Sequence, residues 1–600
     1  MVKLLRYIEI NNKIFFKKLV AFLYSKIELR TFIILSSLVV GILSGIASAV
    51  LKNFVHFLEE KPQIYFHQIG IGFILPFFPL IGIILSALII VLFYKGELSK
   101  GISNIIFRIV RKASDIPKQD IFSHYITSGL SVGFGGSAGL EAPIVITGAA
   151  IGSNLSKGFK FNYKVRTILL ACGSAAGISA IFNSPIAGVI FAIEVLLPEF
   201  SIPSFIPLLI ASASAAVVSR FLYSGQIFYL VTEGWQLNAV PFYAILGILC
   251  GVISLYYIKM TFFIERYFEK LKKNYSKIFI GGLILCLLVF LFPPLYGEGY
   301  ISVKYLLAGQ YDKILPTNFI VSFIDKNLLL IIVAAIIIIT KIGATTLTIS
   351  SGGNGGLIAP SLFSGAFTGF FLAHLMSYLG IIQLNHANFI VVGMAGILSG
   401  MMHAPLTGIF LGAEVTGGYK LIVPFMIVTA LSYFISRYFH RESIYTDPLV
   451  KKGVKFRSEK EKTFIRQIQI EDIIENDFLK LYPKMTLREI MDKIIHSKRN
   501  IFPVVDDSKM LVGIITMDDI REIMLNSDVY DVILAYEIMN TNFHSIDIHS
   551  DLNHALEKFE ENNTWNLAVT DNGKYRGFIS KSNIFNKYLA SMSKQQAEEL

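Results

Sequence analysis

The chain has 600 residues, of which 54% are hydrophobic and only 16% charged, and its mean hydropathy is +0.59. So apolar a composition excludes an ordinary soluble enzyme and predicts a membrane protein. Residues 1–455 carry 36 Lys and Arg against 19 Asp and Glu, whereas residues 456–600 carry 18 against 24. The basic excess therefore lies in the apolar part, where the flanks of membrane spans explain it better than a nucleic-acid-binding surface, and no nucleic-acid partner is expected.

The first 30 residues mix seven Lys and Arg with Phe, Leu and Ile before the first long apolar run begins. This basic stretch is too long for a signal peptide, and the apolar run continues past any cleavage site. We predict an amphipathic helix over residues 1–30 that lies on the cytoplasmic face of the membrane, with the N-terminus inside. The three cysteines are far apart within apolar runs, so neither a disulfide framework nor a metal site is expected.

Apolar runs long enough to cross about 30 Å of hydrocarbon recur along residues 31–450. They cover residues 32–51, 72–94, 205–223, 239–258, 278–294 and 328–343. Shorter apolar pieces, broken by Gly and Pro, lie at residues 121–134, 143–155, 166–182, 185–197, 357–375, 390–402 and 404–416. Irregular backbone at membrane depth is tolerated where protein buries it or where it lines a wet cavity, so these broken helices indicate a permeation site.

Two stretches of the membrane part are repeated. The sequence GGSAGLEAP at 135–143 matches GGNGGLIAP at 352–360 at six of nine positions, with an offset of 217. A second pair, PIAGVIFAIEV at 185–195 and PLTGIFLGAEV at 405–415, follows with an offset of 220. Two matched pairs in the same order and at nearly the same offset predict a duplicated unit, as in membrane proteins built from two inverted repeats.

Each copy of the repeat has a Gly-rich turn followed by Pro near the first turn of an apolar helix. The first N–H groups of such a helix have no partner within the helix, and they carry the positive end of the helix dipole. An anion satisfies both needs, whereas a cation is repelled. If the two helix N-termini meet near the middle of the bilayer, they form a binding site for a desolvated anion without a full positive charge.

These segments also resemble a known family. GLEAP at 139–143 resembles the Gly-x-Glu-Gly-Pro signature of CLC chloride channels and chloride/proton exchangers, and GLIAP at 356–360 resembles their Gly-x-Phe-x-Pro signature. SIYTDPL at 443–449 is similar to the segment that holds their pore tyrosine. The resemblance implies an all-α, multi-pass membrane domain over residues 31–450, a homodimer with one pore in each subunit, and chloride or similar small anions as substrate.

The resemblance implies that Glu141 is the gate, a carboxylate that occupies an anion site and leaves it when it is protonated or displaced. The residues themselves agree, because a carboxylate beside helix N-termini in an apolar segment can take the place of the anion. The alternative is a glutamate buried in an ordinary structural hydrogen bond.

Backbone amides rather than side chains are the expected anion ligands. Leu357 and Ile358 match the two family positions whose N–H groups coordinate the ion, and Ile358 replaces the phenylalanine that is frequent there. Tyr445 matches the tyrosine that closes the inner side of the site, although a tyrosine in an interfacial aromatic belt is the alternative. Further anion contacts are assigned to Gly139 and Leu140.

The inner mouth of the pore departs from the family pattern. The segment Gly-Ser-Gly-Ile-Pro should precede the gate, and the nearest match is Ser99-Lys100-Gly101-Ile102-Ser103. Lys100 then replaces the serine that coordinates the ion. Either the lysine strengthens anion binding and slows release, or it is an ordinary cytoplasmic flank.

The position of the second, internal glutamate of many family exchangers is Val195, and valine cannot relay a proton. This substitution favours channel-like chloride conduction, with coupled chloride/proton exchange as the alternative. Glu194 and Glu414 occupy equivalent positions in the two repeats, which suggests a shared role as structural hydrogen-bond partners rather than as pore groups.

After a linker at residues 451–470, the pattern changes to β-strands and helices. The segments GIITMDD at 513–519 and GFISKSN at 577–583 share Gly-x-x-Ser/Thr-x-x-Asp/Asn, which resembles a tandem pair of CBS domains over residues 471–530 and 531–600. In such α/β pairs a hydroxyl and an acidic residue often hold ATP, ADP or AMP. The residues at these places are Thr516, Asp519, Ser580 and Asn583. An ordinary helix N-cap explains the same residue types, and no cofactor is expected to be required for transport.

Two further functional classes fit the sequence less well. GGSAG at 135–139 satisfies the Gly-x-Ser-x-Gly pattern of a hydrolase, but no strand is expected before it, and the second copy has Asn354 in place of Ser137. A magnesium transporter requires several acidic residues in the pore, whereas the repeat offers amides and one glutamate. We therefore predict a multi-pass anion permease, not an enzyme, with both termini in the cytoplasm.

Overall fold

The computed structural model describes residues 28–68, 72–94, 101–197, 202–223, 225, 234–271, 273–315, 325–454, 469–562 and 564–587. The chain forms two compact units, Met1–Val454 and Lys455–Leu600. The amphipathic helix predicted for residues 1–30 falls almost wholly outside the described residues, as do Ser99, Lys100 and most of the predicted linker.

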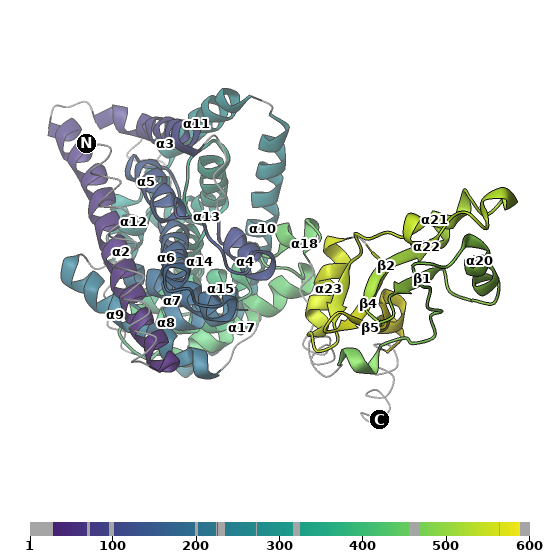
Figure 1. Cartoon of the computed structure of the whole chain (residues 1–600). Helices are drawn as coiled ribbons and strands as arrows, with labels where there is room; N and C mark the ends of the chain where they lie inside the picture. The colour runs from purple at the N-terminus through teal and green to yellow at the C-terminus, as the bar shows by residue number, and fades with distance from the viewer. Residues whose placement is uncertain are drawn as a thin grey trace, which may run out of the picture. The chain divides into compact units, whose positions relative to one another are not determined.

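The described part of the first unit is helical, and its helices cross one another at varied angles (Figure 1). The helices of its first half are α2 (Leu29–Gln68), α3 (Phe78–Tyr94), α4 (Ile102–Arg111), α5 (Asp120–Gly133), α6 (Glu141–Gly158), α7 (Tyr163–Phe182), α8 (Pro185–Phe191) and α9 (Ile202–Leu222). Those of its second half are α10 (Val240–Lys270), α11 (Asn274–Leu291), α12 (Tyr300–Leu307), α13 (Lys326–Ser350), α14 (Ile358–Tyr378), α15 (His386–Met402), α16 (Pro405–Val415), α17 (Ile422–Phe439) and α18 (Asp447–Lys451). Short turns include the 3₁₀ helix η4 (Pro293–Leu295) and the π-helical turn η2 (Ala192–Leu196).

Nine helices within the described residues are long and apolar enough to cross a membrane, and three shorter apolar helices accompany them. The predicted broken pieces are confirmed as α5 to α8 with η2 in the first half and α14 to α16 in the second. Helix α14 has 21 residues, and 89% of its most apolar stretch is buried inside the protein. Its Gly, Ser and Thr content is explained by this burial, because a helix that contacts protein on all sides does not need a lipid-facing surface.

Equivalent helices of the two repeats begin and end in the same way. Asn162 precedes α7 and its side chain accepts a hydrogen bond from the Val165 N–H at 3.0 Å, and Asn385 caps α15 in the same manner. Both helices end at a left-handed residue, Asn183 with φ 55° and His403 with φ 56°. These caps satisfy backbone groups at helix ends and stop each helix before the proline that opens the next one.

The second unit holds two small sheets. Strands β1 (Ile501–Val505) and β2 (Leu511–Thr516) pair antiparallel, and β3 (Ser545–Asp547), β4 (Asn566–Asp571) and β5 (Lys574–Ser580) form a sheet in which β3 and β4 are parallel. The helices around them are α20 (Leu487–Ile495), α21 (Met517–Arg521), α22 (Ala535–Ile538) and α23 (Leu552–Glu561).

The two halves of this unit share backbone and core. Met510 and Lys574 form a bridge between the two hairpins, and Glu475 pairs with Phe578 of β5. Ile470 and Ile473 pack into the core around α23, β4 and β5, although they precede the first sheet in the chain. The beginning of the unit therefore completes the core of its second half.

Candidate anion site

The Gly-rich turns of the two repeats contact each other directly. The Gly139 N–H donates to the Gly356 carbonyl at 2.9 Å, and the Gly356 N–H donates to the Gly139 carbonyl at 2.7 Å. The pairing is antiparallel, so equivalent segments of the two repeats run in opposite directions, as inverted repeats require. Helices α6 and α14 begin within two residues of this bridge, and their N-termini, called here the first and second tips, meet inside the protein.

Only glycine fits at the bridge. A side chain on Gly139 would overlap the Glu141 carboxylate, and one on Gly356 would lie 3.0 Å from the Ala142 amide nitrogen. Gly135 has φ 89° in the turn that follows α5, a conformation that residues with side chains rarely adopt. The element before this turn is a helix, so the strand that a hydrolase nucleophile turn requires is absent from this described segment.

Glu141, the first residue of α6, is fully buried between the two tips. Its Oε1 accepts a hydrogen bond from the Tyr300 hydroxyl at 2.7 Å, and its Oε2 accepts one from the Ala359 N–H at 3.3 Å. Ala359 lies in the first turn of α14, where the dipole of that helix favours negative charge. The carboxylate thus lies where an anion could bind to the second tip.

The predicted amide donors differ in how the protein uses them. The Gly139 N–H is bonded across the bridge, and the Leu140 N–H donates to the Glu298 Oε1 at 3.1 Å. Among the described residues, no acceptor is bonded to the N–H groups of Leu357 and Ile358. In this arrangement the second tip has donors that an anion could use, whereas those of the first tip are occupied.

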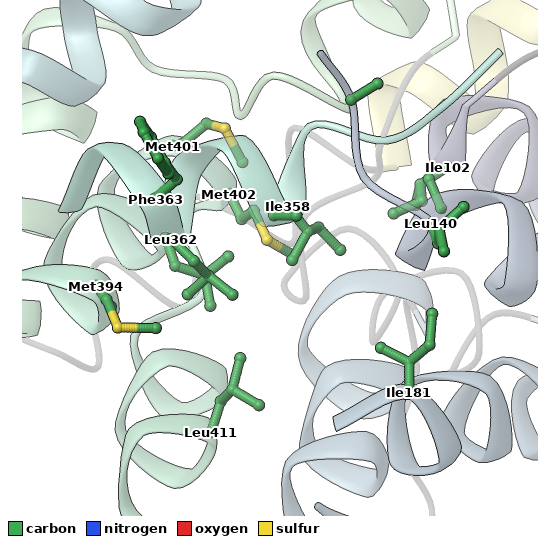
Figure 2. Close-up of a cluster of buried hydrophobic side chains, with 14 of the residues drawn as sticks. Ile102, Leu140, Ile181, Ile358, Leu362, Phe363, Met394, Met401, Met402 and Leu411 are labelled. Carbon is green, nitrogen blue, oxygen red and sulfur yellow. The ribbon is translucent and has the colours of Figure 1, made fainter. Parts of the chain in front are cut away.

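Apolar side chains surround the tips. Leu140, Ile358, Ile102 and Ile181 belong to one buried hydrophobic cluster, in which Figure 2 labels all four side chains. Tyr445 is 4% exposed and belongs to the same buried cluster, and among the described residues its hydroxyl has no hydrogen-bond partner. A buried hydroxyl without a protein acceptor can donate to an anion.

A third helix N-terminus reaches this region. Helix α4 starts at Ile102 after Gly101, which has φ 82°. Ser99 and Lys100 precede it outside the described residues, so their predicted role at the inner mouth stays a prediction.

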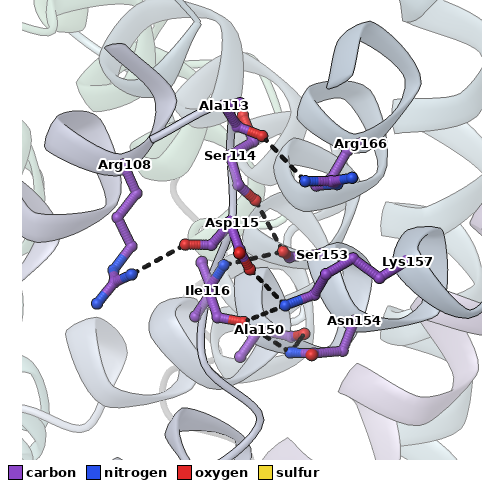
Figure 3. A network of polar contacts seen from close by, with 10 residues as sticks. All are labelled: Arg108, Ala113, Ser114, Asp115, Ile116, Ala150, Ser153, Asn154, Lys157 and Arg166. Carbon is purple, nitrogen blue, oxygen red and sulfur yellow. Dashed lines mark hydrogen bonds and ion pairs between the residues drawn. The ribbon is translucent and has the colours of Figure 1, made fainter. Parts of the chain in front are cut away.

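The segment after α4 is fastened to α6 and α7 by a polar network (Figure 3). Lys157 pairs with Asp115, and the Ser153 hydroxyl donates to the Ser114 carbonyl at 2.7 Å. The Arg108 guanidinium donates to the Asp115 carbonyl at 2.9 Å. The network fixes the connection between α4 and the helices of the first repeat.

Glu194 and Glu414 cap each other's helices. Glu414 accepts hydrogen bonds from the Ile186 and Ala187 N–H groups at 3.0 and 2.8 Å, at the start of α8. Glu194 accepts from Leu406 and Thr407 at 3.1 and 2.7 Å, at the start of α16. This reciprocal arrangement is the structural role that their equivalent positions suggested.

Val195 is half-buried in the π-helical turn η2 and packs against the apolar cluster around the tips. It carries no atom that can hold a proton. The equivalent position in the second repeat, Val415, ends a regular α-helix, so the backbone of the repeats differs at this place. Single π-helical turns often lie at functional sites.

The four residues predicted to bind nucleotide lie at strand-to-helix junctions. The Thr516 hydroxyl donates to the Asp519 carboxylate at 2.7 Å, and the Asp519 N–H donates back to that hydroxyl at 3.4 Å. The Ser580 hydroxyl accepts from the Asn583 N–H at 3.1 Å and donates to the Glu475 carboxylate at 2.6 Å. Both pairs therefore act as N-caps in this structure, as the alternative interpretation held.

An arginine organises the region beside Ser580. Arg499 binds the Glu475 carboxylate at 2.7 Å and the Asp477 carboxylate at 2.6 Å. Its hydrogen bonds lower the pKa of Asp477 below the usual range. A guanidinium at this place is a group that a phosphate could also contact.

Sequence reasoning missed two residues beside Glu141, namely Glu298 and Tyr300. Glu298 lies between Gly297 and Gly299 in the loop that joins η4 to α12, and Tyr300 is the first residue of α12. A single acid between two glycines and after a long apolar helix was the available signal. Nothing local in that loop indicates that it folds onto a turn 160 residues earlier.

Comparison with known proteins decides the family. A model of the voltage-gated chloride channel family matches residues 81–437, more than half of the chain. The chain belongs to the CLC family. Models of the CBS domain match residues 470–526 and 535–590, so this CLC protein also carries a CBS pair. It is a multi-pass membrane protein of a family of anion channels and transporters.

Individual relatives include both kinds of transport protein. "Chloride channel protein CLC-f" of Arabidopsis thaliana is 26% identical over 460 residues, which are 67% of this chain and 57% of that protein. "H(+)/Cl(-) exchange transporter ClcA" of Vibrio parahaemolyticus is 26% identical over 444 residues, 70% of this chain and 89% of the relative. The crystal structure of a CLC-type fluoride/proton antiporter superposes with a TM-score of 0.56 at 26% identity, over 69% of this chain and 97% of that one.

Proposed function

We propose that this CLC protein exchanges chloride for protons at the site between the two helix tips, with Glu141 as the gate. One observation carries the proposal: the Glu141 carboxylate lies against the start of α14 and is hydrogen-bonded to its Ala359 N–H. When chloride binds the neighbouring amides of Leu357 and Ile358, its negative charge repels the Glu141 carboxylate from the start of α14, and protonation of Glu141 weakens its hydrogen bond with the Ala359 N–H.

Proton coupling is the leading mode because a bacterial relative carries the name of an exchanger and a structural neighbour that of a fluoride/proton antiporter. Channel-like conduction is the second candidate. Val195 favours it, because valine offers no inner step for a proton. In both modes Tyr445 contributes the inner contact of the anion, and the role of Lys100 and Ser99 at the inner mouth stays a sequence-based prediction.

Flux through liposomes tests the gate and separates the two modes. The purified full chain moves chloride down an imposed gradient while a dye reports internal pH. For exchange we expect protons to be driven against their own gradient, and Glu141→Gln to abolish proton movement while chloride flux continues. The matched control is Glu60→Gln, which removes the charge of an exposed glutamate on α2. Loss of chloride flux in a folded Glu141→Gln protein contradicts the gate role.

The preference of the site among anions is expected to depend on the two helix tips. The same liposome assay measures it. Amide donors without a full positive charge favour small anions generally, so chloride, nitrate and fluoride compete for one site. Ile358 in place of the family phenylalanine changes the lining and not the donors. We expect Ile358→Phe to change the ratio of nitrate to chloride flux and to leave proton coupling in place.

We further propose that the protein is a homodimer with both termini in the cytoplasm. Crosslinking in membranes reports the oligomeric state, and protease access to a tag at each terminus reports the orientation.

We also propose that the CBS pair binds an adenine nucleotide and that basal transport requires no cofactor. Thermal unfolding of the full chain with and without ATP tests nucleotide binding. If ATP raises the unfolding temperature of the unchanged protein but not that of Asp519→Asn, the nucleotide site is supported. Equal increases in both proteins contradict it.

A further inference from the structure

A second carboxylate, that of Glu298, lies beside Glu141, and the proposed anion site does not use it. Glu298 lies in a tight loop in which Gly297 has φ 59° and Gly299 has φ 88°. The Gly297 N–H donates to the Gly135 carbonyl at 3.0 Å, which fastens this loop to the turn before α6. Glu298 accepts the Leu140 N–H at 3.1 Å and so lies one residue from the gate.

Two lysines accompany Glu298. Lys341 of α13 is fully buried, and its Nζ donates to the Gly297 carbonyl at 3.1 Å. Lys52 of α2 is half-buried, and its Nζ donates to the Ala180 carbonyl at 2.8 Å. Both lysines lie within electrostatic range of Glu298, and neither forms a short ion pair with it among the described residues. An ammonium group buried in a membrane domain is costly, and it is found paired with opposite charge or with backbone carbonyl groups.

A third carboxylate extends the group. Glu59 of α2 is half-buried close to Gly297, and it interacts with Glu298 and Lys341. Exposure rises in order along these carboxylates: Glu141 is fully buried, Glu298 and Glu59 are half-buried, and the neighbouring Glu60 is exposed. Among the described residues, the other titratable groups that face the carboxylates are the tyrosines Tyr223, Tyr296, Tyr300 and Tyr445.

The charges of this group do not balance when every member is ionised. Glu141, Glu298 and Glu59 then carry three negative charges, and Lys52 and Lys341 carry two positive ones. An unpaired buried charge is costly, whereas one proton on a carboxylate makes the group neutral. The group therefore has a place for one proton that three carboxylates can share.

We propose that Glu298 is the proton partner of Glu141, and that Glu59 connects Glu298 to water. The O–H bond of protonated Glu141 breaks, the proton bonds to the Glu298 carboxylate, and Glu141 becomes negative as Glu298 becomes neutral. The total charge beside the lysines is unchanged, so the transfer requires no new counterion. Glu298 then passes the proton to Glu59 and, from there, to the surface.

This inference rests on the proposed exchange and competes with a simpler role in which Glu298 only accepts the Leu140 N–H. Glutamine distinguishes the two roles. Its carbonyl oxygen still accepts that N–H, but its amide does not take up and release a proton near neutral pH. Glu59→Gln is a second variant that leaves the contact with the first tip untouched.

Chloride and proton movement are measured together in liposomes for the unchanged chain, Glu298→Gln, Glu298→Asp, Glu59→Gln and the control Glu60→Gln. We expect Glu298→Gln to keep chloride flux within about twofold and to slow proton movement by about tenfold or more, as for loss of an acid/base group. Glu298→Asp restores part of the proton movement, Glu59→Gln slows it less, and Glu60→Gln matches the unchanged chain.

Each outcome decides one of the two proposals. Wild-type proton movement in Glu298→Gln overturns the inference and leaves the exchange mechanism standing. Chloride flux without any proton movement in the unchanged chain overturns the exchange mechanism instead. In that case the role of Glu298 is tested by the pH dependence of chloride flux. If the two carboxylates share a proton, the Glu298→Gln substitution shifts the midpoint of that dependence by about one pH unit. An unshifted midpoint overturns the inference in that case as well.

Discussion

The two repeats share the backbone of their Gly-rich turns and helix caps, and they differ in the side chains at the two tips. In both, a glycine turn leads to a leucine that precedes the helix, and the following helix starts with an asparagine cap and ends at a left-handed residue. At the first residue of the helix the copies differ: Glu141 begins α6 and Ile358 begins α14. One tip therefore supplies the carboxylate, and the other supplies the Ala359 amide that donates to it. The proposed division into a gate and an anion-binding tip rests on this one difference between equivalent positions.

The difference matters because two identical tips could not provide both a carboxylate and the amide donors that it competes for. Two carboxylates would repel each other across the bridge and leave amide donors unused, and two apolar tips would bind an anion without a gate. Substitutions at three kinds of equivalent position test how alike the two repeats are. These positions are the glycines where helices cross, the reciprocal caps Glu194 and Glu414, and the residues that follow the caps, Val195 and Val415.

The largest expected effect concerns the glycines where paired helices cross. A side chain on Gly152 would overlap the Leu169 carbonyl oxygen, and one on Gly369 would overlap that of Phe389. We expect Gly152→Ala and Gly369→Ala to destabilise the protein equally, by about 2–3 kcal/mol, because the crossing backbones must separate. Thermal unfolding in detergent measures both. Gly343→Ala is the control: its side chain would meet nothing within 4 Å, and it should be neutral or stabilising. Unequal effects of the two variants would show that the repeats do not pack alike.

Weakening the caps should lower the stability of the protein by an intermediate amount, and slightly more in one repeat than in the other. Glu194→Gln and Glu414→Gln each weaken charge-assisted bonds to a helix start, at a cost of about 1–2 kcal/mol. Glu194 also accepts the Thr407 hydroxyl at 2.7 Å, whereas Ala187 stands at that place in the other repeat. Glu194→Gln should therefore lower the unfolding temperature more. The ratio of chloride to protons should stay unchanged in both variants, and a changed ratio would assign a transport role to these residues.

The smallest expected effect is a gain of proton movement. Val195→Glu places a carboxylate at the position that many family exchangers use, next to the apolar cluster around the tips. If the inner proton step limits the rate, this variant increases proton movement per chloride. Val415→Glu, the equivalent change in the other repeat, is the control and should increase nothing. The liposome assay compares them, and equal results for both variants would remove the inner position from the mechanism.

Much of this site follows from local sequence. The two helix starts after Gly139 and Gly356 are predicted from the repeat, because a glycine turn before a proline-containing apolar helix indicates a helix start whose first N–H groups lack partners. The family resemblance assigns roles to Glu141, Leu357, Ile358 and Tyr445 and adds the CBS pair. The competing N-cap interpretation of Thr516 and Asp519 was available for the same reason, since capping is a local interaction.

The tertiary structure decided which groups meet. Only packing brings Glu298 and Tyr300 to Glu141, gives the Leu140 amide an acceptor and leaves those of Leu357 and Ile358 without one among the described residues. From the sequence alone we predict two helix starts able to bind an anion, a carboxylate on one of them and a duplication of the unit that holds them, whereas the pairing of the two starts is a result of the fold. Periodicity, turns and caps depend on neighbouring residues and can be read along the chain. Contacts between residues more than 150 positions apart depend on how the helices pack, and no local pattern encodes them.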